Sequence, residues 1–99
     1  MVNPELIETF DRYVMHRIEP GSFTRSCLEN NLMEAMGKAD IHNRYRLHEI
    51  CSYIFNVLPR NSWGSHENVK SWLSSPKKPS PETIKYYVQR KTNYLNRGV

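Results

Sequence analysis

The same helix-start pattern occurs near both ends of the chain, and it limits the possible folds more than any other feature. Asn3-Pro4-Glu5 and Ser80-Pro81-Glu82 each combine a capping residue, a proline and an acid in the expected first turn. Proline is tolerated there because the first N–H groups of a helix have no acceptor within the helix. The two triplets therefore predict helices that begin at residues 4 and 81.

Apolar residues recur with helical spacing between these two points. The pattern predicts five helices, whose expected N-caps are Asn3, Ser22, Asp40, Ser65 and Ser80. Pro20-Gly21 is expected to end the first helix and Pro59 the third. The predicted inner faces include Ile18, Met36, Cys51 and Phe55. Because no alternating pattern persists beyond about five residues, we predict an all-α fold, a compact bundle of about five helices.

The composition indicates a small domain without a membrane segment. A length of 99 residues suits one modest core, and 11% aromatic residues offset a hydrophobic share of only 38%. No apolar run approaches the length needed to span a bilayer, and the acidic N-terminal segment does not resemble a signal peptide. We therefore expect a cytoplasmic protein with no membrane contact. Cys27 and Cys51 suit reduced thiols, although a disulfide between them stays open.

The positive charge is concentrated in the last quarter of the chain. Residues 76–99 carry six basic residues and one acidic residue, a net charge of +5, whereas residues 1–75 carry eight basic and nine acidic residues, a net charge of −1. We divide the chain into a helical core domain at 1–75 and a linker plus basic amphipathic helix at 76–99. That helix packs on the core or on a second copy, so a homo-oligomer stays open. The charge favours an anionic partner, although a solvated basic helix is the plainer interpretation.

The residue spacing gives little support for a catalytic site or a metal site. His48 and Cys51 share a helix face, but no third orienting group and no oxyanion loop accompany them. The cysteines and histidines lack the close spacing of a metal site, and no glycine-rich nucleotide-binding motif occurs. We predict a protein that is not an enzyme, with no catalytic residue, no metal ligand and no cofactor.

Two Gly-Ser loops, "EPGSF" at residues 19–23 and "SWGSHE" at residues 62–67, precede predicted helices. Helix N-termini expose N–H donors that bind anions, and glycine lets the backbone approach a phosphate. The alternative is that glycine only makes the turn and serine only caps the helix. The candidate ligand-binding residues at these loops are Arg17, Ser22, Arg25, Arg60, Trp63 and Ser65.

Basic and aromatic residues alternate in "IKYYVQRKTNYLNR" at residues 84–97. Tyr86 and Arg90, with either Tyr94 or Arg97, can share one helical face that stacks a base and pairs a phosphate. Arg44 and Tyr45 in "HNRYR" form a second such cluster. Either cluster is equally explained by solvated charges beside the edge of a core.

Three segments, "HRIEPGSFTRSCLENNLMEAMGKADIHNR", "ICSYIFNVLPRNSWGS" and "VKSWL", resemble a family of small, functionally unassigned tailed-bacteriophage proteins. The resemblance covers about residues 16–73 and excludes both terminal helices. It implies a phage accessory protein in the cytoplasm of a bacterial host, acting by binding rather than by chemistry.

These observations lead to one expected function and two alternatives. We expect a non-enzymatic phage accessory protein, with counter-defence as a candidate role, that binds an anionic small molecule such as a nucleotide or a cyclic oligonucleotide signal. One alternative is a protein–protein inhibitor of a host or defence enzyme. The other is a nucleic-acid-binding module, although a net charge of +4 is modest for one.

Overall fold

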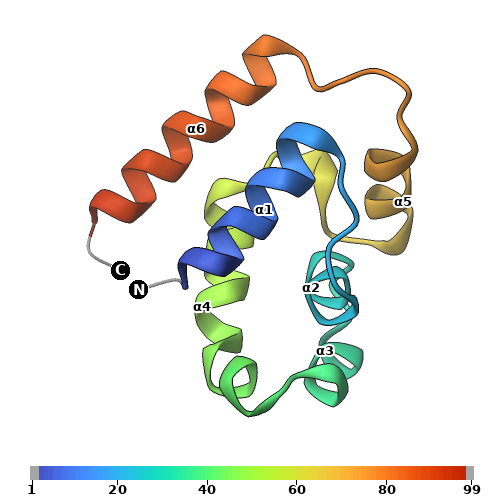
Figure 1. Cartoon of the computed structure of the whole chain (residues 1–99), viewed down its shortest axis with the longest axis vertical. Helices are drawn as coiled ribbons and strands as arrows, with labels where there is room; N and C mark the ends of the chain where they lie inside the picture. Colours follow the sequence, from blue (N-terminus) through green and yellow to red (C-terminus); the bar gives the residue numbers. More distant parts are fainter. Residues whose placement is uncertain (1–2, 98–99) are drawn as a thin grey trace.

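The computed structural model describes residues 3–97, and this part of the chain is all-helical, as predicted (Figure 1). The elements are α1 (Pro4–His16), α2 (Ser22–Leu28), α3 (Leu32–Lys38), α4 (Ile41–Val57), the 3-10 helix η1 (Arg60–Ser62), α5 (His66–Ser74) and α6 (Pro81–Asn96). They form a flat body of 36 × 31 × 18 Å. A thickness of 18 Å corresponds to about two helix diameters, so most helices lie beside one another with one face exposed.

The segment predicted as a single second helix is two short helices. Asn30 adopts a left-handed conformation, with φ of 61°, and this turns the chain after α2. The side chain of Asn31 then accepts a hydrogen bond from the backbone N–H of Glu34 at 3.3 Å and caps α3. Asparagine tolerates both the left-handed and the capping conformations, so the Asn30-Asn31 pair was the signal of this break.

Four of the five expected N-caps are confirmed. Each side-chain oxygen accepts a backbone N–H in the first turn; these caps are Asn3, Asp40, Ser65 and Ser80. Ser22 was wrong as a cap because Gly21, in an extended conformation, holds the N-cap position and Ser22 is the first residue of α2. The carbonyl of Ser22 instead accepts the hydroxyl of Ser26 at 3.0 Å.

Buried tyrosines form the centre of the core, and their hydroxyl groups are hydrogen-bonded. Tyr13 donates to the carbonyl of Ser62 at 2.7 Å, and Tyr87 donates to a carboxylate oxygen of Asp11 at 2.6 Å. The hydroxyl groups of Tyr53 and Tyr87 are 3.2 Å apart. These bonds matter because a buried hydroxyl without a partner costs about 1–3 kcal/mol.

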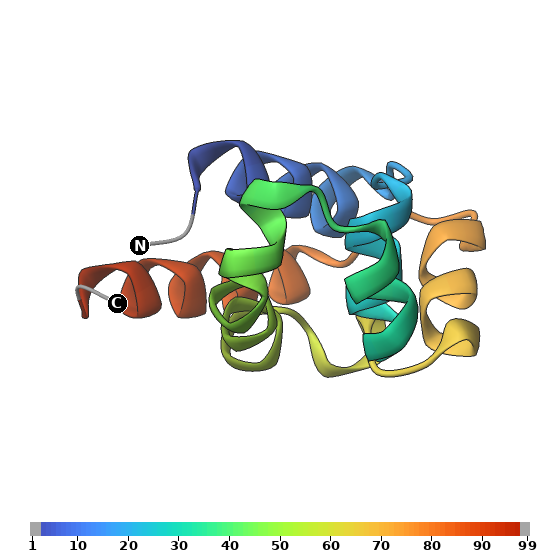
Figure 2. The same ribbon diagram turned by 90° about the horizontal axis from the view of Figure 1, so that it is seen from below.

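The basic C-terminal helix packs on its own chain. Figures 1 and 2 show α6 running beside α1 and α4. The ammonium group of Lys91 lies 2.7 Å from Asp11 Oδ2 on α1, and the hydroxyl of Tyr94 lies 2.7 Å from that of Ser52 on α4. The inner face of α6 therefore combines two buried aromatic residues, Tyr87 and Tyr94, with the charged Lys91.

The linker before α6 is held by Arg17, at the end of α1. Arg17 has φ of 54°, a left-handed conformation that ends the helix. Its Nε donates to the carbonyl of Lys77 at 2.8 Å, and its Nη1 donates to the carbonyl of Trp72 at 2.6 Å. The guanidinium also lies 4.4 Å from the centre of the Trp72 ring. One side chain thus connects α1, α5 and the linker.

The predicted inner faces, which also included Leu32 and Val88, were wrong at six positions. At the five positions within helices, the buried stripe is narrower than the apolar pattern. On α4 the buried residues include Ile50, Tyr53 and Ile54, whereas Phe55 is 68% exposed. Successive helical residues are turned by about 100°, so Phe55 faces away from the core. The other exposed positions within helices are Leu32, Met36, Cys51 and Val88. Ile18 is also exposed, because α1 ends at His16, two residues before it.

The tyrosine–carboxylate network generates a prediction about stability. Tyr87→Phe should lower the free energy of unfolding by about 1–3 kcal/mol, because Asp11 loses a donor and Tyr53 loses its neighbour. Urea unfolding followed by circular dichroism measures this change. The matched control is Tyr86→Phe, which removes the same atom from an exposed ring on the same helix. Equal effects of the two substitutions would contradict the role given to the network.

Candidate anion-binding site

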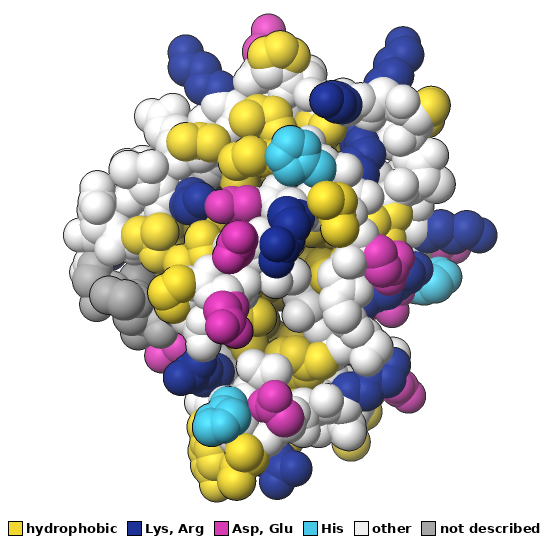
Figure 3. All heavy atoms as spheres, viewed as in Figure 1, with side chains coloured by type: hydrophobic (Ala, Val, Ile, Leu, Met, Phe, Trp, Pro, Cys, Tyr) yellow, Lys and Arg dark blue, Asp and Glu magenta, His cyan; other side chains and the backbone are white. Residues whose placement is uncertain are grey.

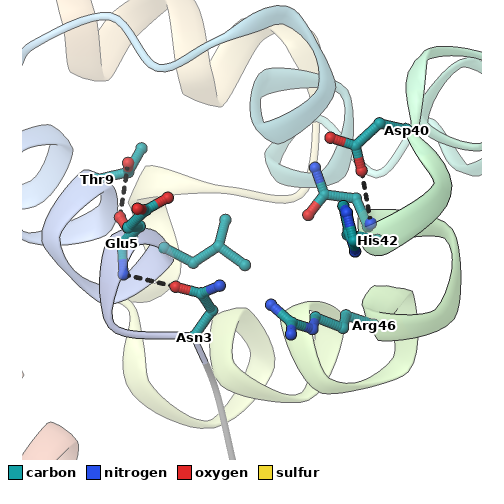
Figure 4. Close-up of a pocket in the computed structure, with 8 residues that line it drawn as sticks. Asn3, Glu5, Thr9, Asp40, His42 and Arg46 are labelled. Carbon is teal, nitrogen blue, oxygen red and sulfur yellow. Dashed lines mark hydrogen bonds between the residues drawn. The ribbon is translucent and has the colours of Figure 1, made fainter.

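A pocket of about 430 Å³ lies between the starts of α1 and α4 (Figure 4). In Figure 4, His42 and Arg46 extend from α4 toward Asn3 and Glu5 at the start of α1. The remaining lining residues are Leu6, Thr9, Asp40 and Asn43. The sequence analysis did not identify this pocket, because residues far apart in the chain form it.

The charges in the α1–α4 pocket are mixed. Glu5 and Asp40 contribute carboxylates, and Arg46 contributes a guanidinium. Asp40 is also occupied as the cap of α4, where it accepts the N–H of Asn43 at 2.8 Å. A phosphate in this pocket would be repelled by two carboxylates, so the pocket suits an uncharged polar or zwitterionic ligand better than an anion.

A second pocket, between α4 and α6, is smaller and basic. Its volume is about 120 Å³, and its lining residues are Asn56, Arg90, Asn93, Tyr94 and Arg97. This lining provides two guanidinium groups and two amides and includes no carboxylate. Such donors match the oxygen atoms of a phosphate.

An exposed aromatic ring adjoins the α4–α6 pocket. Nη1 of Arg90 donates to the hydroxyl of Tyr86 at 3.0 Å, and its guanidinium carbon lies 5.3 Å from the centre of that ring. Tyr86 is 54% exposed, so part of its side chain is accessible to a ligand. Positions 86, 90, 93 and 97 follow the helical period, which explains why they form one stripe. The sequence left open whether Tyr94 or Arg97 accompanies Tyr86 and Arg90, and both of them line the same pocket as Arg90.

Asp11 determines which cations of α6 remain available. It pairs with Lys91 on the inner face of the helix, at 2.7 Å. Arg90 and Arg97 lie on the neighbouring stripe, where the second pocket lies. Figure 3 shows acidic and basic side chains close together across the middle of the face that carries α1, so the charge of that face is largely balanced. Arg90 and Arg97 thus stay outside the ion pair that engages Lys91.

The cations near the first Gly-Ser loop are already paired within the protein. Arg25 lies 2.6 Å from Glu19 and 3.0 Å from Glu29, and Glu29 also contacts His66 at 2.7 Å. Arg17 donates to two carbonyl groups of the fold. The helix that follows, α2, has only seven residues. The loop therefore makes a turn between two helices and offers an anion little unpaired charge.

The second Gly-Ser loop is also occupied by internal bonds. Gly64 has φ of 107°, which favours glycine, and its N–H donates to the carbonyl of Leu28 at 2.7 Å. Ser65 caps α5, and Arg60 stacks 4.4 Å from the centre of the Trp63 ring. Trp63 is half-buried and packs edge-on against Phe55. With these contacts, the second Gly-Ser loop covers the end of α4.

Arg44 and Tyr45, the remaining candidate residues, lie in the exposed N-terminal part of α4. Tyr45 is 84% exposed, and neither residue lines the α4–α6 pocket. The structure therefore brings together Tyr86, Arg90 and Arg97, and it leaves the other candidates at separate places. Asn56 and Asn93 were missed because neutral amides carry no distinctive sequence signal.

Within residues 3–97, no three His, Cys, Asp or Glu side chains are arranged to hold a metal ion. No helix in that range is both long enough and apolar enough to cross a bilayer.

Comparisons with known proteins provide no further guide to the site. The chain matches no protein-family model, and searches of curated proteins and of solved structures find no significant match. The phage setting therefore stays a prediction that depends on the resemblance of residues 16–73. The geometry of the site is therefore the evidence for function.

The Arg25–Glu29–His66 cluster generates a prediction about pH. Burial raises the pKa of Glu29, but hydrogen bonds from Arg25 and His66 outweigh it, so the pKa lies below its ordinary value. A lowered folded-state pKa stabilises the protein above the unfolded value, about 4.3, and this contribution is lost as the pH falls through the folded-state value. Glu29→Gln should thus be less stable than the parent at neutral pH, with the difference shrinking in acid.

Thermal unfolding at several pH values between about 3 and 7 measures this difference. The control is Glu67→Gln, which removes an exposed carboxylate from the first turn of α5. A constant stability difference between Glu29→Gln and the parent over the acid range would contradict the ion-pair assignment.

Proposed function

We propose that this chain is a non-enzymatic binding protein for a phosphate-bearing ligand of the nucleotide class, including cyclic oligonucleotides. The single observation that carries the proposal is the convergence of Arg90 and Arg97 with two amides in one pocket, beside an exposed tyrosine ring. The lining of this pocket holds two cations and no carboxylate. It therefore has the electrostatic character that the α1–α4 pocket lacks.

The donors of the pocket suit a phosphate group. Guanidinium groups form paired hydrogen bonds with phosphate oxygens, and these charge-assisted bonds are stronger than neutral ones. The amide of Asn93 adds N–H donors, whereas Nδ2 of Asn56 already donates to the carbonyl and the hydroxyl of Ser52, at 2.8 and 3.3 Å. A volume of about 120 Å³ accommodates a phosphate but not a whole nucleotide. The base of the ligand would then lie outside the pocket, over the ring of Tyr86.

Binding rather than catalysis is favoured by the residue types. The lining supplies no carboxylate, imidazole or thiol, the groups that most often transfer protons or attack a substrate. The hydroxyl of Tyr94, which is also in the lining, is bonded to Ser52. Sequestration of a nucleotide signal in an infected bacterium is the biological role that agrees with the phage resemblance, and it stays a prediction.

The proposal predicts the effects of two charge removals. Arg90→Gln and Arg97→Gln should each weaken binding by about tenfold to a hundredfold, the loss of a hydrogen bond to a charged group. A thermal-shift panel of nucleotides and cyclic di- and trinucleotides identifies the ligand, and isothermal titration calorimetry then measures the dissociation constants. At a ligand concentration of a hundred times the dissociation constant, binding should add about 2.7 kcal/mol to the stability.

Two matched controls test the location of the site. Arg46→Gln removes the same group from the α1–α4 pocket, and Lys85→Gln removes a cation from an exposed position of α6 outside the pocket. Both variants should retain the parental affinity. Loss of binding in Arg46→Gln but not in Arg90→Gln would move the site to the larger pocket. An absence of any thermal shift across the panel would reject the nucleotide proposal.

A second candidate function, inhibition of a host or defence protein by direct binding, is favoured by exposed apolar side chains. These side chains lie on α3 and at the start of α4, and they are Leu32, Met33, Met36, Ile41 and Tyr45. Met33 is 80% exposed. Exposed apolar groups of this kind mark protein-binding surfaces, and methionine adapts to varied partners. We call this set of five residues the α3–α4 corner.

The α3–α4 corner predicts a protein partner that does not require the basic pocket. A Met33→Asp/Tyr45→Asp double variant should no longer retain the partner that the parent protein captures from a lysate of infected bacteria. Arg90→Gln should retain it, because the pocket lies on other helices. Sedimentation velocity of the purified protein provides the second readout. Self-association that is lost in the double variant would show that the corner binds a second copy instead.

A further inference from the structure

The two cysteines, which lie 24 positions apart in the sequence, meet where α2 contacts α4. Cys27 on α2 is buried, and Cys51 on α4 is exposed. Both residues line the same two cavities, one of about 30 Å³ and one of about 200 Å³. A buried thiol and an exposed thiol therefore lie beside the same cavities.

The two thiols also affect each other's ionisation. A hydrogen bond with the Cys27 thiol lowers the pKa of Cys51, against the opposing effect of burial. The same hydrogen bond, together with burial, raises the pKa of Cys27. His48, which the sequence placed on the same helix face as Cys51, is not among the groups that shift its pKa. Cys27, and not His48, lines the same cavities as Cys51.

The larger cavity has apolar walls. Ile54, Phe55 and Trp63 line it together with the two cysteines and Asn30. A small uncharged oxidant can enter such a cavity without a cost for desolvating a charge. Hydrogen peroxide has these properties, and it reacts with thiolates.

We propose that Cys51 and Cys27 form an oxidation site, in which Cys51 reacts with hydrogen peroxide and Cys27 then closes an intramolecular disulfide between α4 and α2. The site is independent of the proposed phosphate pocket, because none of its residues lines that pocket. Cys51 is the attacking residue because it is exposed and is the thiol more readily deprotonated. Cys27 is the resolving residue because it lies next to Cys51 and is shielded from solvent.

The oxidation takes place in two steps. The Cys51 thiolate attacks one oxygen of the peroxide, the S–O bond forms as the O–O bond breaks, and hydroxide leaves and is protonated to water. The Cys27 sulfur then attacks the sulfenic sulfur of Cys51, the S–S bond forms as the S–O bond breaks, and the hydroxyl leaves as water with the Cys27 proton. Two thiols are oxidised and one peroxide is reduced to two waters.

Intact-mass spectrometry of the peroxide-treated full-length chain tests the proposal. The parent protein should lose about 2 Da, the mass of two hydrogen atoms, and a reductant should reverse the loss. Cys27→Ser should instead accumulate a sulfenic acid at Cys51 that a 1,3-dicarbonyl reagent traps. Cys51→Ser should show neither product. Circular dichroism before treatment establishes that each variant is folded.

Two further readouts distinguish a specific site from general oxidation. Iodoacetamide should label Cys51 of the native protein at least about tenfold faster than Cys27, because the exposed thiolate is the reactive form. The fluorescence of Trp63, in the wall of the same cavity, should change on oxidation. In Trp63→Phe the mass loss should persist while the fluorescence change is reduced.

Several results would overturn the proposal. These are an unchanged mass of the parent protein at a peroxide concentration that oxidises a free cysteine peptide, disulfide-linked dimers in place of the intramolecular bond, and faster labelling of Cys27 than of Cys51. None of these measurements involves a phosphate ligand, so a result that rejects the oxidation site leaves the proposed function unaffected.

Discussion

The position of the last helix depends on one half-buried carboxylate, Asp11. It accepts the hydroxyl of Tyr87 at 2.6 Å and pairs with Lys91 at 2.7 Å, so it holds two successive turns of α6 against α1. Tyr87 then contacts Tyr53 of α4. A half-buried carboxylate needs such partners, since it cannot remain charged without compensation when water is removed. This requirement fixes the rotation of α6 about its own axis.

That rotation decides which side chains are available for binding. With Tyr87 and Lys91 turned inward, Tyr86, Arg90 and Arg97 lie on the adjacent outer stripe, next to Asn56 of α4. The proposed phosphate pocket is thus a consequence of the packing of α6 and not of a separate loop or motif. The Gly-Ser loops do not form such a pocket, because Glu19, Glu29 and backbone carbonyl groups already bind their charged neighbours. Their main role is to turn the chain between helices.

The cysteine pair joins a buried residue of α2 to an exposed residue of α4. Cys51 was expected on the inner face of its helix, and its exposure follows from the narrow buried stripe of α4. The same narrow stripe leaves Phe55 exposed, where it packs against Trp63 and helps to enclose the cavity beside the two thiols. In a body only 18 Å thick, a helix cannot bury a wide face, so reactive and apolar groups remain near solvent.

The sequence by itself determined the helical class and most helix boundaries, because caps, prolines and apolar spacing act over a few neighbouring residues. Asn3, Asp40, Ser65 and Ser80 were predictable for this reason. Only the tertiary structure decided that Arg17 and Arg25 are engaged within the fold, that Arg90 and Arg97 share a pocket with Asn56, and that Cys27 lies beside Cys51. These outcomes depend on contacts between residues far apart in the chain, and helical periodicity specifies which face a residue occupies but not what that face meets.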